Sequence, residues 1–121
     1  MSVNRISEKA LKKLIRGHID QEALCVIKFY SNKCEYCSAL HDHYVELANS
    51  NEEDSVHFFA FNVDDANNLD SLIKINGVPT IASVKTGLIK SRVRILGDPD
   101  PPHENTWYHS GDIKDFIQRG K

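Results

Sequence analysis

The chain has 121 residues, of which 40% are hydrophobic and 26% are charged, and its formal net charge is −2. A chain of this size and composition folds as one soluble domain, so we expect a single domain over residues 1–121. A net charge this close to zero creates no overall field that would attract nucleic acid or an anionic membrane surface. The apolar runs are also too short to span a bilayer, and we expect neither nucleic acid nor membrane as a partner.

The apolar pattern predicts alternating helices and strands in the first two thirds of the chain. Helical spacing of apolar residues indicates a helix over 7–16, and a nearly continuous run of β-formers indicates a buried central strand over 23–30. A helix over 34–49 follows, and then a second buried strand over 56–63 and a short helix around 69–73.

The last third is predicted to hold a hairpin, a loop and a final helix. Strands over 80–84 and 89–96 flank a turn, and the segment 97–105, with three prolines, is typical of a surface loop. Residues 106–109 are predicted to return briefly to the sheet before a helix over 110–120. The order of elements predicts an α/β fold.

The location and the use of the cysteines follow from their number and setting. The charged N-terminal segment 1–17 lacks the apolar block of a secretory signal, which predicts a cytoplasmic protein. Cysteines stand only at positions 25, 34 and 37, an odd and sparse set that does not suit the disulfide framework of a small secreted domain. Such a set indicates redox chemistry or metal binding.

The segment Cys34-Glu35-Tyr36-Cys37 lies where a predicted strand is followed by a helix. A cysteine at a helix N-terminus gains from unpaired backbone N–H groups that stabilise its thiolate, which makes Cys34 the candidate nucleophile. Cys37 lies about one turn further along, where its sulfur can resolve a mixed disulfide. The same CxxC spacing also serves as half of many zinc sites.

A zinc site would need further ligands near this pair. They would be Cys34 and Cys37 with His41 or His43 and, as a fourth, Cys25 or His57. The sequence contains no second CxxC and no HxxxH. We interpret His41 and His43 as solvated histidines and Cys25 as an inert thiol of the strand core, and we expect no metal site.

Together with residues further along the chain, the CxxC segment resembles the thioredoxin superfamily. The resemblance is carried by Val26 to Cys37, by Val63-Asp64 and by Gly77-Val78-Pro79-Thr80, and it covers about Ala23 to Ile117. It implies a thioredoxin-like fold, a mixed central sheet flanked by helices, whose first strand is missing or reduced to residues 3–5. It also implies that Pro79 is cis and lies against the CxxC, with Val78 offering backbone hydrogen bonds to an extended substrate.

The motif departs from that of thioredoxins proper, which carry Trp-Cys-Gly-Pro-Cys. Lys33 precedes the pair here and Tyr36 stands just before the second cysteine. Because this segment must lie at the surface for exchange to occur, we expect Lys33 and Tyr36 to contact substrates. A tyrosine at this place and the segment 110–112 are similar to glutaredoxins. A glutaredoxin-like, glutathione-dependent oxidoreductase therefore stays open, as does a non-catalytic thioredoxin-fold binding module.

Lys28 matches the position where thioredoxins bury a carboxylate that accepts the proton of the second cysteine. A lysine inside a strand covered on both faces either extends its ammonium to water or has a lowered pKa. Both interpretations remain open. In the second, Lys28 takes part in proton transfer with Cys37.

The predicted function is thiol–disulfide exchange on protein substrates, with Cys34 as nucleophile, Cys37 as resolving cysteine and Val78-Pro79 aligning the substrate. We expect a redox-active disulfide between the two cysteines, no bound cofactor, and recycling by a thioredoxin reductase or by glutathione. The expected partners are disulfide-containing proteins and that reductase, and the expected state is a monomer. The expected roles are electron transport and cell redox homeostasis.

Overall fold

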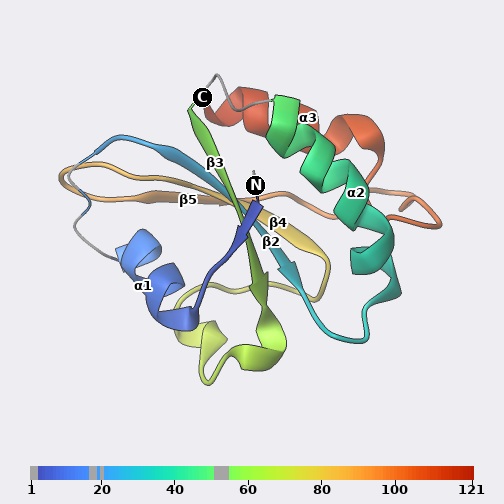
Figure 1. Ribbon diagram of the computed structural model, residues 1–121, viewed down its shortest axis with the longest axis horizontal. Coiled ribbons are helices and arrows are strands. Elements are labelled where there is room, and N and C mark those ends of the chain that lie inside the picture. Colours follow the sequence, from blue (N-terminus) through green and yellow to red (C-terminus); the bar gives the residue numbers. More distant parts are fainter. Residues whose placement is uncertain (1–2, 17–18, 20, 51–54) are drawn as a thin grey trace.

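A five-stranded mixed sheet forms the centre of the molecule (Figure 1). The computed structural model describes residues 3–16, 19, 21–50 and 55–121. In spatial order the strands are β1 (Val3–Arg5), β3 (Val56–Asn62), β2 (Leu24–Tyr30), β4 (Thr80–Lys85) and β5 (Arg92–Ile95). The first three run parallel to one another, β4 is antiparallel to β2, and β5 is antiparallel to β4.

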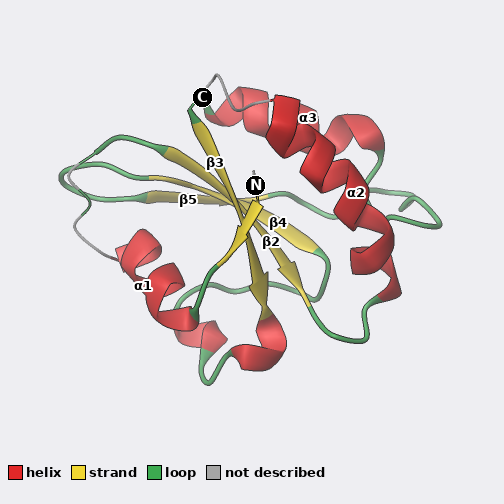
Figure 2. Cartoon of the chain, viewed as in Figure 1, coloured by secondary structure: helices red, strands yellow, loops and turns green. Residues whose placement is uncertain are grey.

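Helices cover both faces of this sheet (Figure 2). On one face lies α1 (Glu8–Arg16), together with the 3-10 turns η2 (Val63–Asp65) and η3 (Leu69–Ser71). On the other face lie α2 (Glu35–Ser50) and α3 (Ser110–Gly120). In the described part of the chain, no helix has the length and apolar character needed to cross a membrane.

The alternation of side chains along β2 divides the core into two clusters. Val26 faces α2 and α3 and packs in a cluster with Leu40 and Ile113. Ile27 faces the opposite side and packs in a cluster with Leu11 of α1. Both faces of β2 are therefore dry, which explains why its sequence is almost continuously apolar.

Tyr44 joins α2 to the sheet. Its side chain is fully buried, and its hydroxyl lies 3.0 Å from the backbone oxygen of Val26 and 2.7 Å from that of Phe59. Burial raises the pKa of this hydroxyl well above its usual value, so it stays protonated and donates. Because this one hydroxyl contacts backbone oxygens of two strands, it holds the middle of α2 over the sheet.

Most predicted elements are present, with shifted ends. The first strand is reduced to three residues, as the resemblance implied, and it pairs with β3. The helix expected around 69–73 is only the 3-10 turn η3. The strand expected over 89–96 is shorter, because Leu88 and Ile89 project into solvent and leave β5 to begin at Arg92.

The prediction that residues 106–109 return to the sheet was wrong. Trp107 pairs instead with His103 in an isolated antiparallel bridge, which folds the predicted loop back on itself. Trp107 has a φ of 67°, a left-handed conformation that does not continue a strand.

Candidate active site

Cys34 caps the N-terminus of α2. Its carbonyl accepts the first helical hydrogen bond, from the N–H of Ser38 at 3.2 Å, and its Sγ accepts one from the N–H of Cys37 at 3.1 Å. The helix predicted to start at Cys34 therefore starts one residue later, because Cys34 occupies the capping position. The N–H group that reaches its sulfur would also stabilise a thiolate there.

Cys37 lies one turn into α2 and is joined to Cys34 by a disulfide. Their Cα atoms are 5.2 Å apart, within the range that a disulfide bridges without backbone movement. Cys34 is half-buried whereas Cys37 is buried. Cys34 is therefore the more exposed residue of the pair.

A small polar network holds the loop that leads from β2 to Cys34. The N–H of Asn32 donates to the carboxylate of Asp64 at 2.9 Å, and the amide of Asn62 donates to the side-chain oxygen of Asn32 at 2.8 Å. The N–H of Asp64 in turn donates to Asn62 at 3.0 Å. Asp64 belongs to the Val63-Asp64 pair noted in the sequence, but its role in fixing this loop was not predicted.

Pro79 reaches the same edge of the sheet through the register of β4. Thr80 pairs with Phe29, so Pro79 lies beside the end of β2, where the loop to Cys34 begins. The Val78–Pro79 peptide bond is cis, and Val78 is half-buried. The carbonyl of Pro79 lies 3.4 Å from the hydroxyl of buried Tyr108, which supports the start of β4 from the α3 side.

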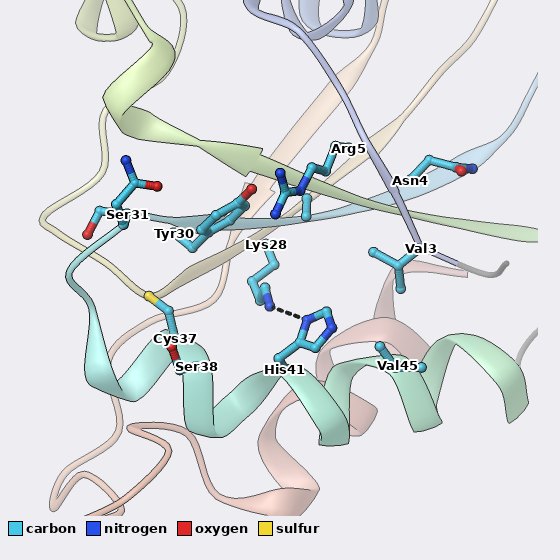
Figure 3. A pocket seen from close by; sticks show the side chains of 12 residues that line it. Val3, Asn4, Arg5, Lys28, Tyr30, Ser31, Cys37, Ser38, His41 and Val45 are labelled. Carbon is cyan, nitrogen blue, oxygen red and sulfur yellow. Dashed lines mark hydrogen bonds between the residues drawn. The ribbon is translucent and has the colours of Figure 1, made fainter.

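Lys28 is buried, with only 3% of its side chain exposed, and so does not extend its ammonium into water. Figure 3 shows its side chain directed from β2 toward α2, where its Nζ lies 3.2 Å from Nδ1 of His41. Burial, and secondarily the charge of Arg5, lowers the pKa of Lys28 to about 8. Of the two interpretations of Lys28, the lowered pKa is the one that this burial supports.

His41 is exposed, as expected of a solvated histidine. Its Nδ1 also lies 3.2 Å from the Nζ of buried Lys28, a contact that was not predicted. One turn of α2 separates His41 from Cys37, so both project from the same side of the helix, and both line one pocket. The sequence signal for the place of His41 beside Cys37 and Lys28 was its helical spacing from the CxxC, combined with the lysine in the facing strand.

Tyr36 and Trp107 form an aromatic surface beside the disulfide. The rings meet edge to face with centroids 5.5 Å apart, and Tyr36 is 37% exposed. The indole N–H of Trp107 donates to Asp98 at 3.1 Å, so the proline-rich loop holds the ring in place. Trp107 therefore contacts both the proline-rich loop and Tyr36. Lys33 is exposed next to Cys34.

The remaining sequence candidates lie elsewhere or serve the fold. Cys25 is on the α1 face of β2, and burial raises the pKa of its thiol to about 11, as expected of an inert core cysteine. Asp112, in the segment similar to glutaredoxins, accepts the N–H of His109 at 2.8 Å and thereby caps α3. Among the residues that the structure describes, no cluster of three or more His, Cys, Asp or Glu side chains is arranged to hold a metal ion.

Comparisons with known proteins agree on the fold. The profile of the family described as Thioredoxin matches residues 3–97. A search of curated proteins finds no match. Among solved structures, the thioredoxin Mala s 13 of Malassezia sympodialis is 17% identical, with a TM-score of 0.69 over 98% of this chain and 90% of its own. Chloroplastic thioredoxin z is 18% identical, with a TM-score of 0.68 over 98% and 94%.

A third similar structure is a fragment of a larger protein. The J-Trx1 fragment of ERdj5 is 14% identical, with a TM-score of 0.71 over 98% of this chain and 51% of that fragment. At these identities the likeness bears on the fold. The mixed α/β thioredoxin-like fold expected from the sequence is confirmed.

Proposed function

Since the chain belongs to the thioredoxin family, we propose that it is a thiol–disulfide oxidoreductase that reduces or exchanges disulfides in protein substrates. The observation that carries the proposal is the placement of Cys34 as the cap of α2, with Cys37 buried one turn behind it and within disulfide reach. The arrangement offers one accessible sulfur for attack and one protected sulfur for resolution.

The first step uses the reduced protein. The Cys34 thiolate attacks one sulfur of the substrate disulfide, whose S–S bond breaks as a Cys34–substrate bond forms. The other substrate sulfur leaves with the electron pair of the broken bond and takes up a proton. The Cys37 N–H that bonds Cys34 Sγ stabilises the attacking thiolate before the step.

The second step releases the substrate. Cys37 loses its proton, and its thiolate attacks Cys34 Sγ, which breaks the mixed disulfide and forms the Cys34–Cys37 bond. The second substrate sulfur leaves as a thiolate and is protonated. The substrate has then gained two electrons and the protein has lost two.

Removing the proton from Cys37 is the task of Lys28 and His41 in this proposal. All three residues line one pocket, in which a water molecule can connect the amine to the thiol. A pKa of about 8 leaves roughly a tenth of the Lys28 amine neutral at pH 7, and a neutral amine accepts a proton. In Lys28→Ala, the rate of the second step should depend differently on pH, whereas Lys12→Ala on exposed α1 should leave the profile unchanged. An unchanged profile in Lys28→Ala would make this lysine purely structural.

Substrate binding is assigned to the surface around Cys34. Lys33, Tyr36 and the backbone of Val78 contact the substrate chain, and Pro79 fixes the position of that backbone. The ring of Trp107 enlarges the aromatic surface on the Tyr36 side. A protein segment with an extended backbone and an apolar side chain near its disulfide fits this surface.

The proposal also covers how the oxidised cysteine pair is reduced again and where in the cell the protein acts. The oxidised pair is reduced again by a thioredoxin reductase or by glutathione, without a resident cofactor. The protein acts as a monomer in the cytoplasm, where its partners are disulfide-containing proteins and the reductase. Its cellular roles are electron transport and redox homeostasis.

The decisive experiment is to equilibrate the protein with glutathione buffers and trap the free thiols. A potential near that of thioredoxin, about −270 mV, supports a general reductant, and one of about −200 mV or above supports an oxidising or glutaredoxin-like role. If no Cys34–Cys37 disulfide forms at any ratio of reduced to oxidised glutathione, the exchange chemistry is refuted.

Variants distinguish the roles of the two cysteines in a turnover assay with a protein disulfide as substrate. Cys34→Ser should abolish turnover, and Cys37→Ser should attack once and accumulate the mixed disulfide. Cys25→Ala is the matched control and should turn over at the wild-type rate, because this thiol lies on the α1 face of the sheet, away from α2. Full biological activity in Cys34→Ser would support a binding module instead.

A further inference from the structure

A pocket of about 720 Å³ lies between the sheet and α2, and Cys37 is among its lining residues (Figure 3). Its wall on the sheet side comes from β1, β2 and β3, and its other wall is one side of α2. The space exists because small residues face it, Ala60 on β3 and Ser38 on α2. Its volume is that of a typical small-molecule site, well above what a single water or ion needs.

The pocket is lined by cationic groups and by no Asp or Glu of the described chain. The guanidinium of Arg5 and the Nζ of Lys28 lie 5.8 and 5.6 Å from the centroid of the same Tyr30 ring. In Figure 3 the Arg5 side chain lies beside the Tyr30 ring, whereas the Lys28 side chain is directed toward His41 on α2. Both basic residues line the same pocket.

These charges lack a counter-ion within the described residues. Lys28 is 97% buried, and its polar contact is with His41 Nδ1, an imidazole nitrogen rather than a carboxylate. The charge of Arg5 acts on Lys28 unfavourably, as part of what lowers the pKa of this amine. A buried cation beside a second cation is costly unless an anion joins them.

We propose that this pocket binds a small molecule through an oxyanion group, a phosphate or a carboxylate, held between Arg5 and Lys28. Guanidinium and ammonium groups are the side chains that recognise such oxyanions most strongly. The hydroxyl of Ser38, on the α2 side, supplies a neutral hydrogen-bond donor for the rest of the ligand. Lys28 and Ala60, at the bottom of the pocket, are buried, whereas Arg5 and Ser38, at its opening, are exposed. A ligand can therefore enter from solvent.

The site is separate from the surface proposed for protein substrates. Neither Lys33 nor Tyr36 lines the pocket, nor do Val78 and Pro79. Cys37 is the one redox cysteine that it reaches. Binding can therefore be measured in the disulfide form without turnover, and the inference does not rest on the proposed exchange activity.

The test is a titration of the ¹⁵N-labelled disulfide form, followed by amide chemical shifts. The probes are inorganic phosphate and succinate, each added at constant ionic strength against sodium chloride. We expect saturable shifts grouped at Arg5, Lys28, Ser38 and His41. Saturation by phosphate alone identifies a phosphoryl ligand, saturation by succinate alone identifies a carboxylate ligand, and both support the shared oxyanion chemistry.

Variants decide whether the two cations hold the probe. Arg5→Gln and Lys28→Met should each weaken binding at least tenfold, whereas Arg5→Lys keeps a charge and should lose less. Lys12→Met removes an equal charge from exposed α1 and should bind as the wild type does. The proposal is overturned if neither probe saturates, or if folded Arg5→Gln binds as tightly as the wild type.

Discussion

Replacing Lys28 with Met should stabilise the folded protein at neutral pH, although it removes a side chain from the candidate active site. The pKa of this lysine falls from 10.5 in the unfolded chain to about 8 in the folded protein, mainly because the ammonium loses water. At about 1.4 kcal/mol per pH unit, that difference amounts to about 3 kcal/mol of stability lost by keeping the amine charged in the fold. The variant also loses the contact with His41, so we expect a gain of about 1 to 3 kcal/mol.

The gain should depend on pH in a defined direction. Below pH 8 the amine is protonated in both states, so the full cost of burying the charge is present. Between about 8 and 10.5 the unfolded chain holds a proton that the folded protein has released, and the wild type therefore becomes more stable as pH rises. Met has no such dependence, so the advantage of Lys28→Met should shrink toward zero across this range.

Urea unfolding of the disulfide form, without reductant, measures the effect. Cys25 and Tyr108, whose pKa values rise to about 11 and about 12, also contribute at high pH, but they do so equally in both proteins. The difference between the two curves therefore isolates Lys28. Lys12→Met, on the exposed side of α1, should show no pH-dependent difference from the wild type. Parallel curves for Lys28→Met and the wild type from pH 7 to pH 10 would refute the reasoning.

Three further substitutions test other parts of the structure. Tyr44→Phe removes a fully buried hydroxyl that joins α2 to two strands and should cost about 1 kcal/mol in urea unfolding; an unchanged midpoint would mean that the hydroxyl contributes nothing. Trp107→Ala removes the edge-to-face contact with Tyr36 and should raise KM for a protein disulfide roughly 2- to 10-fold, while the rate with a small disulfide stays the same; equal effects on both substrates would contradict a docking role. Asp64→Ala removes the acceptor of the Asn32 N–H and should speed amide exchange at Asn32 several-fold, whereas unchanged exchange would show that the loop is held by other contacts.

The sequence predicted the elements and the CxxC site because the signals for both are local. An apolar run such as residues 24–29 indicates a strand covered on both faces, and helical spacing after Cys34 indicates α2, whatever the rest of the chain does. The same local signal failed at Trp107. Residues 106–109 favour a strand, but Trp107 has a left-handed backbone conformation and pairs with His103. No periodicity in the sequence indicates this pairing.

The sequence by itself therefore determined the α/β order, the place of the CxxC pair at a strand–helix junction and the presence of a lysine in a dry strand. Only the tertiary structure decided what surrounds that lysine. Arg5 comes from a short strand whose parallel pairing with β3 is set by register, and His41 comes from a helix whose rotation is set by packing. Contacts between residues far apart in the chain depend on how whole elements pack. The cationic pocket beside Cys37 appears only once β1, β2 and α2 are assembled.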